Sequence, residues 1–121
     1  MEPAAEEEFA ALLRARSVEL QRSAAAAAAD LDGIRSARSA ATADDEHDPE
    51  GSTLAADWSR TVALSGAAAA ELREVEAALG RLEAGDYGRC ESCGVAIPVE
   101  RLRIRPAATR CVTCAAQHPA R

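Results

Sequence analysis

The sequence predicts a mainly α fold: a long antiparallel helical hairpin, a coiled coil, followed by a small C-terminal module that contains all of the cysteines. Three observations support this prediction. Strong helix formers (alanine, leucine, arginine and glutamate) dominate residues 4–84. Aromatic residues are only 2% of the 121-residue chain, and alanine buries little area, so a conventional globular core would be thin. The four cysteines form two C-x-x-C pairs within residues 90–114.

The first predicted helix covers residues 4–43. Pro3 suits a first helical turn, and the glutamates that follow it complement the positive end of the helix dipole. A stripe of apolar residues recurs every seven positions, which is typical of a helix that winds around a partner helix. Its members are Leu13, Leu20, Ala27, Ile34 and Ala41, flanked by Leu31.

Residues 44–52 interrupt this pattern with one proline, one glycine and five acidic residues. Such a composition predicts a solvated connection. Ser52 or Thr53 can then cap a second helix.

The second predicted helix covers residues 53–84 and has the clearest periodicity in the chain. Its apolar and small residues alternate in steps of four and three, as a coiled-coil seam requires. Because the connection is short, the two helices must run antiparallel. Gly85 ends the second helix at a typical C-cap position. The seam residues are Leu54, Trp58, Thr61, Ser65, Ala68, Leu72, Val75, Leu79 and Leu82.

The cysteine pairs, Cys90/Cys93 and Cys111/Cys114, are separated by seventeen residues. This is the signature of a four-thiolate zinc site, because two-residue spacing lets one tight turn offer two sulfurs to a tetrahedral ion. Gly94 suits the turn after the first pair. We therefore expect one structural Zn²⁺ in a C4 zinc finger. Four thiolates leave no open position for water, so the ion is not expected to be catalytic.

Other uses of the cysteines stay open at this point. Iron also accepts tetrahedral thiolates, and four cysteines can form a disulfide framework. A redox dithiol needs only one pair, usually beside a βαβ pattern that is missing here. Val95, Ile97, Leu102 and Ile104 are available as a small core for this module.

The charge is unevenly distributed along the chain. Residues 1–84 carry 8 Arg and 17 acidic residues, whereas residues 85–121 carry 6 Arg and 3 acidic residues, so the net charge of −6 is the sum of −9 and +3. An acidic body makes direct nucleic-acid binding unfavourable and favours a basic protein partner. No signal peptide and no apolar run long enough to span a membrane are found, which predicts a cytoplasmic protein.

The C-terminal part of the chain resembles the DksA/TraR C4-type zinc-finger proteins of bacteria. The resemblance rests on residues 78–94, A-L-G-R-L-E-A-G-D-Y-G-R-C-E-S-C-G, and continues to the second cysteine pair, covering roughly the last 44 residues. It implies that the metal ligands are Cys90, Cys93, Cys111 and Cys114. The architecture of the family agrees with the organisation predicted from the residues: a hairpin at 1–84 with an acidic tip at 44–52, a zinc finger at 85–116 and a short tail at 117–121.

The same resemblance implies a function. Proteins of this family bind RNA polymerase and insert the hairpin tip through its secondary channel. They alter the stability of promoter complexes, often together with guanosine tetraphosphate. Asp48-Pro49 matches the Asp-Pro step of family tips, whereas Glu50 and Gly51 stand where a second Asp is common. The expectation is a transcription regulator that binds polymerase and has no enzymatic activity, since no catalytic motif appears.

Two groups of residues are candidates for partner contacts: the acidic tip and a basic group beside the metal. Both have plainer interpretations, as a soluble turn and as cations that neutralise the zinc thiolates. If the basic stretch were extended, alternation would put Arg101, Arg103 and Arg105 on one side. Two other functions stay open: direct nucleic-acid binding through the arginines, and a thiol or zinc redox sensor. The tip candidates are Asp44, Asp45, Asp48 and Glu50, and the basic group is Arg101, Arg103, Arg105 and Arg110.

Overall fold

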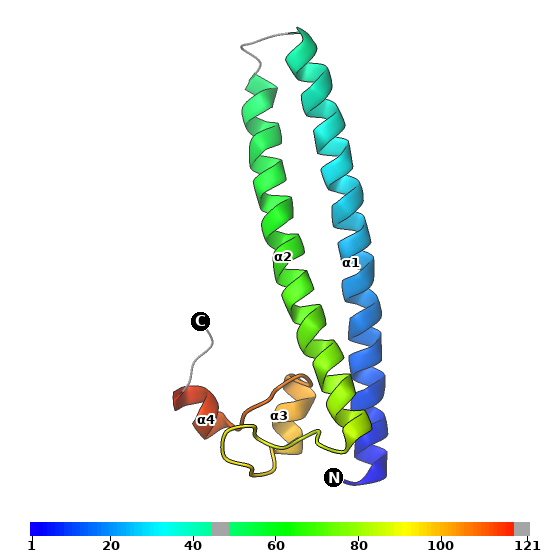
Figure 1. The fold of residues 1–121 in the computed structure, drawn as a ribbon, viewed down its shortest axis with the longest axis vertical. Helices are drawn as coiled ribbons and strands as arrows, with labels where there is room; N and C mark the ends of the chain where they lie inside the picture. Colours follow the sequence, from blue (N-terminus) through cyan, green and yellow to red (C-terminus); the bar gives the residue numbers. More distant parts are fainter. Residues whose placement is uncertain (45–48, 118–121) are drawn as a thin grey trace. The chain divides into compact units, whose positions relative to one another are not determined.

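The computed structural model describes residues 1–44 and 49–117, with side chains described for residues 1–40 and 53–117. This part of the chain is mainly helical and contains no strand beyond one isolated bridge. Two long helices form an antiparallel hairpin and two short helices follow them, so the predicted fold class is confirmed (Figure 1). The helices are α1 (Pro3–Asp44), α2 (Pro49–Ala84), α3 (Val99–Ile104) and α4 (Val112–Gln117).

The start of α2 differs from the sequence prediction. The helix begins at Pro49 and not at Thr53, so Ser52 and Thr53 are not its caps. Proline is well suited to a first helical position, because its fixed φ is already helical and its missing N–H has no partner there in any case. The predicted connection at 44–52 is therefore too long: Asp44 belongs to α1, and residues 49–52 belong to α2.

The end of α2 is as predicted. Gly85 has a φ of 81°, which is left-handed and suits glycine. Its N–H donates to the carbonyl of Leu82 at 3.3 Å, and the N–H of Asp86 donates to the carbonyl of Arg81 at 2.9 Å. This pair of bonds is the Schellman motif, which satisfies carbonyls at the end of a helix.

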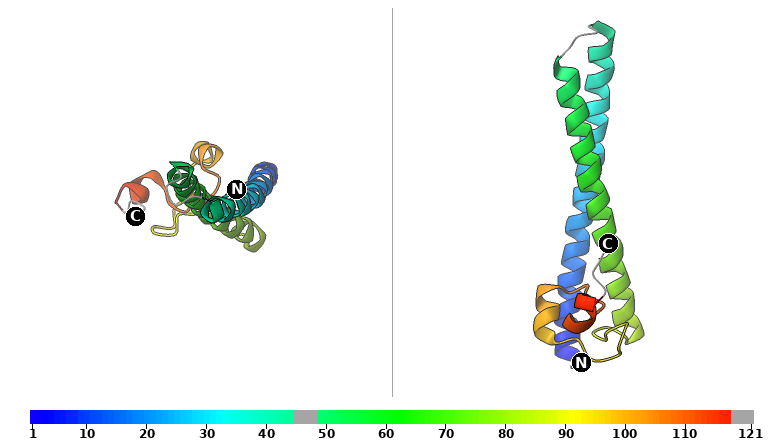
Figure 2. Two further views of the ribbon diagram at one scale, coloured as in Figure 1. Left: turned by 90° about the horizontal axis from the view of Figure 1, so that it is seen from above. Right: turned by 90° about the vertical axis from the view of Figure 1, so that its left-hand side faces the viewer.

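The chain divides into two compact units, one of which is Glu19–Leu72. In this unit the C-terminal part of α1 and the N-terminal part of α2 lie side by side and run in opposite directions (Figures 1 and 2). The indole of Trp58 is half-buried, and the Arg35 guanidinium lies 5.6 Å from its ring centroid. Trp58 is therefore a packing residue with a cation–π partner, which is worth roughly 0.5–1 kcal/mol at an exposed site.

The predicted seams agree with the burial of the two long helices. On α2, every seam residue from Leu54 to Leu82 is buried or half-buried. On α1, Leu13 and Leu20 are buried, and Ala27 and Ile34 are half-buried. The side chain of Ala41 lies outside the described residues.

The other unit combines Met1–Val18 with Arg73–Arg121 and is described to residue 117. It contains all of the buried apolar residues of the described chain except Leu20. The ring centroids of Phe9 and Tyr87 are 5.6 Å apart, so the first turns of α1 pack on the segment that leads to the cysteines. Its buried apolar residues are Phe9, Leu13, Val75, Ala78, Tyr87, Ile97 and Leu102.

The small core expected for the cysteine module is half right. Ile97 and Leu102 are buried, but Val95 and Ile104 are 52% and 82% exposed. Phe9 and Tyr87 are also buried in this unit. Ile104 ends α3, and Val95 belongs to the turn after the first cysteine pair.

The two compact units do not follow the boundary at residues 84/85 drawn from the sequence, because each unit takes parts of both long helices. The division into 1–84, 85–116 and 117–121 therefore stays a prediction about sequence modules. The predicted tail falls on Gln117, the last residue of α4, and on 118–121, which lie outside the described residues. No described helix is long and apolar enough to cross a membrane.

Replacing Phe9 with alanine should destabilise this unit strongly. The ring is fully buried, and truncating a buried phenylalanine to alanine costs about 3–5 kcal/mol. Leu12, 42% exposed on the same part of α1, is the matched control, and Leu12→Ala should change stability by less than about 1 kcal/mol. Urea denaturation followed by circular dichroism measures both. Equal effects of the two changes would contradict the packing described.

Candidate metal centre

The first cysteine pair lies in a tight turn between α2 and α3. Arg89 and Ala96 form an antiparallel bridge, and the N–H of Cys90 donates to the carbonyl of Val95 at 2.8 Å. Gly94 has a φ of 77°, and its N–H donates to the carbonyl of Cys90 at 2.9 Å. The left-handed conformation at Gly94 closes the turn, as expected from its position after the pair.

The second pair lies at the start of α4. Cys111 precedes the helix, Cys114 is inside it, and the N–H of Ala115 donates to the carbonyl of Cys111 at 2.9 Å. A single helical turn therefore presents both sulfurs. Cys114 and Cys90 are buried, Cys111 is half-buried and Cys93 is exposed.

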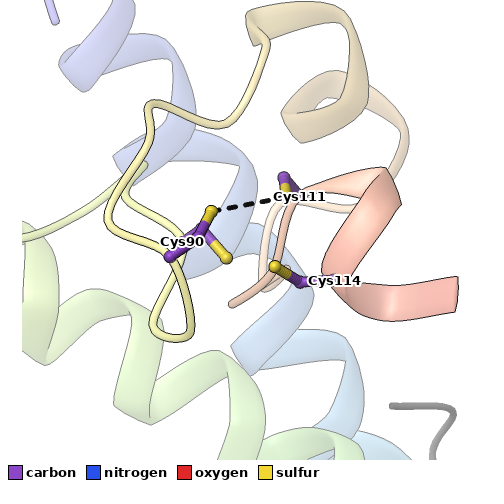
Figure 3. A group of neighbouring side chains, drawn as sticks. Cys90, Cys111 and Cys114 are labelled. Carbon is purple, nitrogen blue, oxygen red and sulfur yellow. Dashed lines mark hydrogen bonds between the residues drawn. The ribbon is translucent and has the colours of Figure 1, made fainter. Parts of the chain in front are cut away.

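The four sulfurs meet in one place. Every pair of Sγ atoms lies within 4.8 Å, and Sγ of Cys93 and Sγ of Cys111 are 3.8 Å apart. In Figure 3 the side chain of Cys90 points from its turn toward Cys111 and Cys114. Four sulfurs at about 2.3 Å from a tetrahedral zinc would be about 3.8 Å from one another. The spacing of the cluster is therefore that of a metal site.

The electrostatics of the cluster favour a bound cation. The pKa of Cys90 is lowered to about 6, first of all because the backbone N–H of Cys111 donates to its sulfur. The pKa of Cys114 is instead raised to about 12, chiefly by hydrogen bonding with Cys111 and then with the other two sulfurs. Four thiolates this close repel one another, and a dication at their centre removes that repulsion. With four protein ligands the coordination sphere is complete, so such an ion stabilises structure and does not activate water.

Tyr87 connects the first cysteine turn to the segment before the second pair. Its hydroxyl donates to the carbonyl of Pro106 at 2.6 Å, and its ring packs against Phe9. Burial raises the pKa of Tyr87 to about 12, although the nearby Arg81 guanidinium acts in the opposite direction.

The basic group does not have the arrangement considered from the sequence. Residues 99–104 form the helix α3 and not an extended segment, so alternation does not align Arg101, Arg103 and Arg105. Pro98 precedes the helix, and the backbone N–H groups of Arg101 and Leu102 donate to its carbonyl. Pro106 follows soon after the helix, where a proline commonly stands because it cannot continue one.

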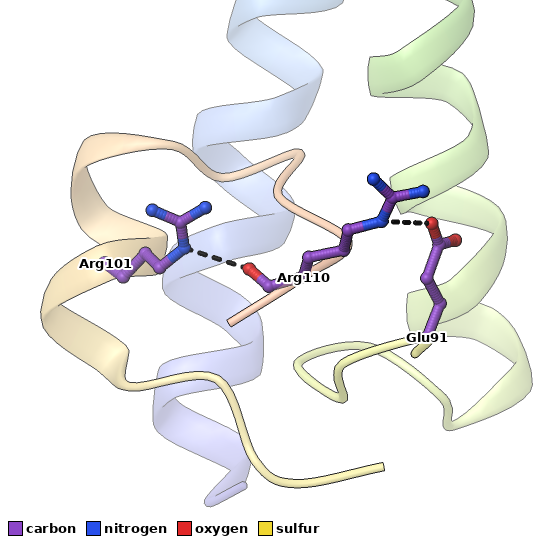
Figure 4. Close-up of polar contacts among 3 residues, drawn as sticks. All are labelled: Glu91, Arg101 and Arg110. Atoms are coloured by element: carbon purple, nitrogen blue, oxygen red, sulfur yellow. Dashed lines mark hydrogen bonds and ion pairs between the residues drawn. The ribbon is translucent and has the colours of Figure 1, made fainter. Parts of the chain in front are cut away.

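Three of the four arginines make contacts within the protein. Nε of Arg101 donates to the carbonyl of Arg110 at 3.0 Å, and Nε of Arg110 donates to Oε1 of Glu91 at 3.1 Å (Figure 4). Nε of Arg103 donates to Oε1 of Glu8 on α1 at 3.1 Å, and this carboxylate raises the pKa of Arg103. The side chain of Arg105 is exposed and has no hydrogen bond or ion pair among the described residues.

The acidic tip cannot be placed in the same way. Asp45 and Asp48 lie outside the described residues, and the side chains of Asp44 and Glu50 are not described. The partner-binding role of the tip stays a prediction, as does that of the basic group.

Sequence reasoning missed several residues that organise the site, namely Glu8, Phe9, Tyr87 and Glu91. A signal for Glu91 was present: an acidic residue follows the first cysteine and a basic one, Arg110, precedes the third. Because the two cysteine pairs must meet at one metal ion, opposite charges beside them should come close enough to form a salt bridge. Phe9 and Glu8 gave no comparable local signal, because their partners are far away in the sequence.

Comparisons with known proteins agree with this site. Residues 85–120 match the family described as the prokaryotic dksA/traR C4-type zinc finger. A solved structure of the transcription factor DksA2 from Pseudomonas aeruginosa is 25% identical, has a TM-score of 0.81, and aligns over 97% of this chain and 84% of its own. Residues 85–120 are thus similar to DksA/TraR C4-type zinc fingers, and the chain as a whole has the fold of DksA2. One zinc ion is accordingly its cofactor, and the four cysteines are positioned to hold one metal ion.

Sequence relatives match over less than half of this chain. A 43-residue stretch is 44% identical to the RNA polymerase-binding transcription factor DksA of Escherichia coli K12, covering 36% of this chain and 28% of that protein. The DksA of Haemophilus influenzae is 40% identical over 43 residues, covering 36% of this chain and 30% of that protein. An uncharacterized protein of Aquifex aeolicus is 46% identical over 52 residues, covering 43% of this chain and 36% of that protein. The chain thus matches about a third of the length of these relatives.

The environment of Tyr87 predicts a pH dependence. A folded-state pKa raised from 10.0 to about 12 means that the neutral phenol is favoured in the folded protein. Its contribution to stability is complete below pH 10 and is lost as the pH rises toward about 12. Because the chain has one tyrosine, tyrosinate absorbance in the near ultraviolet reports this group alone.

We expect the absorbance midpoint of the folded protein to lie well above that of the urea-unfolded protein. Tyr87→Phe should remove the corresponding loss of stability at high pH. Identical midpoints for the folded and unfolded chains would contradict the burial described.

Proposed function

We propose that this protein is a zinc-dependent transcription regulator that binds RNA polymerase. Cys90, Cys93, Cys111 and Cys114 hold the zinc, and the zinc finger gives the base of the hairpin a fixed structure. The observation that carries the proposal is the likeness to DksA2, which includes the long hairpin as well as the cysteine module and covers 97% of the chain. Three other relatives, from Escherichia coli, Salmonella and Haemophilus, are named as RNA polymerase-binding transcription factors.

In this proposal the hairpin enters the secondary channel of polymerase and its acidic end, at residues 44–52, acts near the active centre. Five acidic residues in nine supply negative charge at a confined site, where the low dielectric strengthens its effect. The protein is cytoplasmic, as binding to bacterial polymerase requires, and it acts by binding and not by catalysis.

Arg105 is the member of the basic group that we propose for contact with the complex. Its guanidinium is exposed and has no partner among the described residues, whereas Arg101, Arg103 and Arg110 hold contacts within the protein. A free guanidinium binds carboxylates and phosphates. It can therefore bind a carboxylate of polymerase or guanosine tetraphosphate at the complex. Direct nucleic-acid binding has less support, because three of the four arginines are engaged and the net charge is −6.

The proposal predicts tight, tip-dependent binding to purified bacterial RNA polymerase. Neutralising the four tip candidates should weaken binding about tenfold, equal to roughly 1.4 kcal/mol, and should abolish the effect on the lifetime of promoter complexes. Fluorescence anisotropy of labelled protein measures the first effect and competition assays on promoter DNA measure the second. The tip variant combines Asp44→Asn, Asp45→Asn, Asp48→Asn and Glu50→Gln.

A matched control neutralises the same number of charges at exposed positions near the end of α2, and it should bind like the unaltered protein. Failure of the unaltered protein to bind polymerase would overturn the proposal. Equal losses for tip and control variants would overturn the role of the tip. The control combines Glu74→Gln, Glu76→Gln, Glu83→Gln and Asp86→Asn, all of them exposed in the structure.

A further inference from the structure

The two cysteine turns are joined by residues that are not themselves metal ligands. Glu91 directly follows Cys90 and Arg110 directly precedes Cys111. Nε of Arg110 donates to Oε1 of Glu91 at 3.1 Å, which links the two turns through an ion pair (Figure 4). A backbone bond runs beside it, since the N–H of Glu91 donates to the carbonyl of Thr109 at 2.8 Å.

A third contact reaches the same place from α3. Nε of Arg101 donates to the backbone carbonyl of Arg110 at 3.0 Å, in a partly buried position. This bond fixes the peptide that leads into Cys111. A charged donor makes such a bond stronger than one between neutral groups.

We propose that Glu91, Arg101 and Arg110 form a clasp that positions the second cysteine pair against the first and thereby sets how slowly zinc is lost. Stepwise release of zinc requires the two cysteine pairs to separate. When one metal–sulfur bond breaks, contacts that still hold the two cysteine pairs together keep the free sulfur near the ion. The bond then re-forms more often than the ion is lost. Residues outside the ligand set commonly tune metal affinity by orienting the ligands in this way. The inference rests on the proposed ligand set and is independent of polymerase binding.

The expected change in the rate of zinc release depends on how exposed each contact is to solvent. The side chains of Arg110 and Glu91 are 35% and 53% exposed, and an ion pair of this kind changes an equilibrium by about two- to fivefold. The Arg101 bond is partly buried and charge-assisted, so its loss should accelerate zinc release roughly tenfold.

The chain offers a closely matched control. Arg103 and Glu8 form an ion pair with the same 3.1 Å distance and with side chains 53% and 42% exposed. This pair joins α3 to α1 and does not join the cysteine turns. Removing this pair tests whether the loss of any surface ion pair in this unit accelerates the release of zinc.

The experiment measures the rate of zinc transfer from the full-length, zinc-loaded protein to a chromophoric chelator under reducing conditions. Arg110→Gln and Glu91→Gln should each release zinc about two- to fivefold faster. The two changes together should accelerate release by less than the product of the single effects, because both remove the Glu91–Arg110 ion pair. Arg101→Gln should be faster still, and Arg103→Gln should match the unaltered protein. Added salt should accelerate release from the unaltered protein more than from Arg110→Gln.

Exchanging the charges of Glu91 and Arg110 distinguishes loss of their ion pair from a general loss of stability. The combination of Glu91→Arg with Arg110→Glu should release zinc more slowly than either of these changes alone. Unchanged rates for Arg110→Gln and Glu91→Gln, or the same acceleration in Arg103→Gln, would overturn the clasp. If circular dichroism shows that Arg101→Gln does not fold, the variants at Glu91 and Arg110 still test the clasp. An unaltered protein that yields no zinc to the chelator under denaturing conditions would instead refute the ligand set.

Discussion

The meeting of four sulfurs within 4.8 Å is the constraint on which the C-terminal part of this protein depends. α3 and α4 have only six residues each, too few to be stable helices alone. The turn that holds the first pair is closed by a few backbone bonds around Gly94. A zinc ion that binds both turns contributes its binding energy to folding, and small zinc modules depend on that contribution.

The core beside the metal is shared with α1. Phe9 packs its ring on Tyr87, Tyr87 donates to the carbonyl of Pro106, and Arg103 of α3 pairs with Glu8. These contacts hold the start of α1 to the module although almost eighty residues separate Phe9 from Tyr87 in the sequence. The compact unit that contains the metal site is therefore built from both ends of the chain.

Much of this could be predicted from the sequence, for reasons that differ among elements. The seam of α2 was predictable because its steps of four and three recur from Leu54 to Leu82. The meeting of the four cysteines was predictable because the spacing of two C-x-x-C pairs suits one tetrahedral ion. The start of α2 was missed because a Pro-Glu-Gly-Ser stretch is typical of a turn as well as of a helix start. α3 was missed because it has only six residues, and because Arg101, Arg103 and Arg105, the last of which follows the helix, alternate as in a strand. The contacts of Phe9 and Glu8 depend on chain topology, which local patterns do not encode.

X-ray absorption at the zinc edge of protein purified under reducing conditions tests the central claim most directly. The geometry predicts one zinc per chain with four sulfur neighbours at about 2.3 Å and no nitrogen or oxygen in the first shell. A shell that contains nitrogen or oxygen, or a protein that is fully folded without any metal, would contradict it.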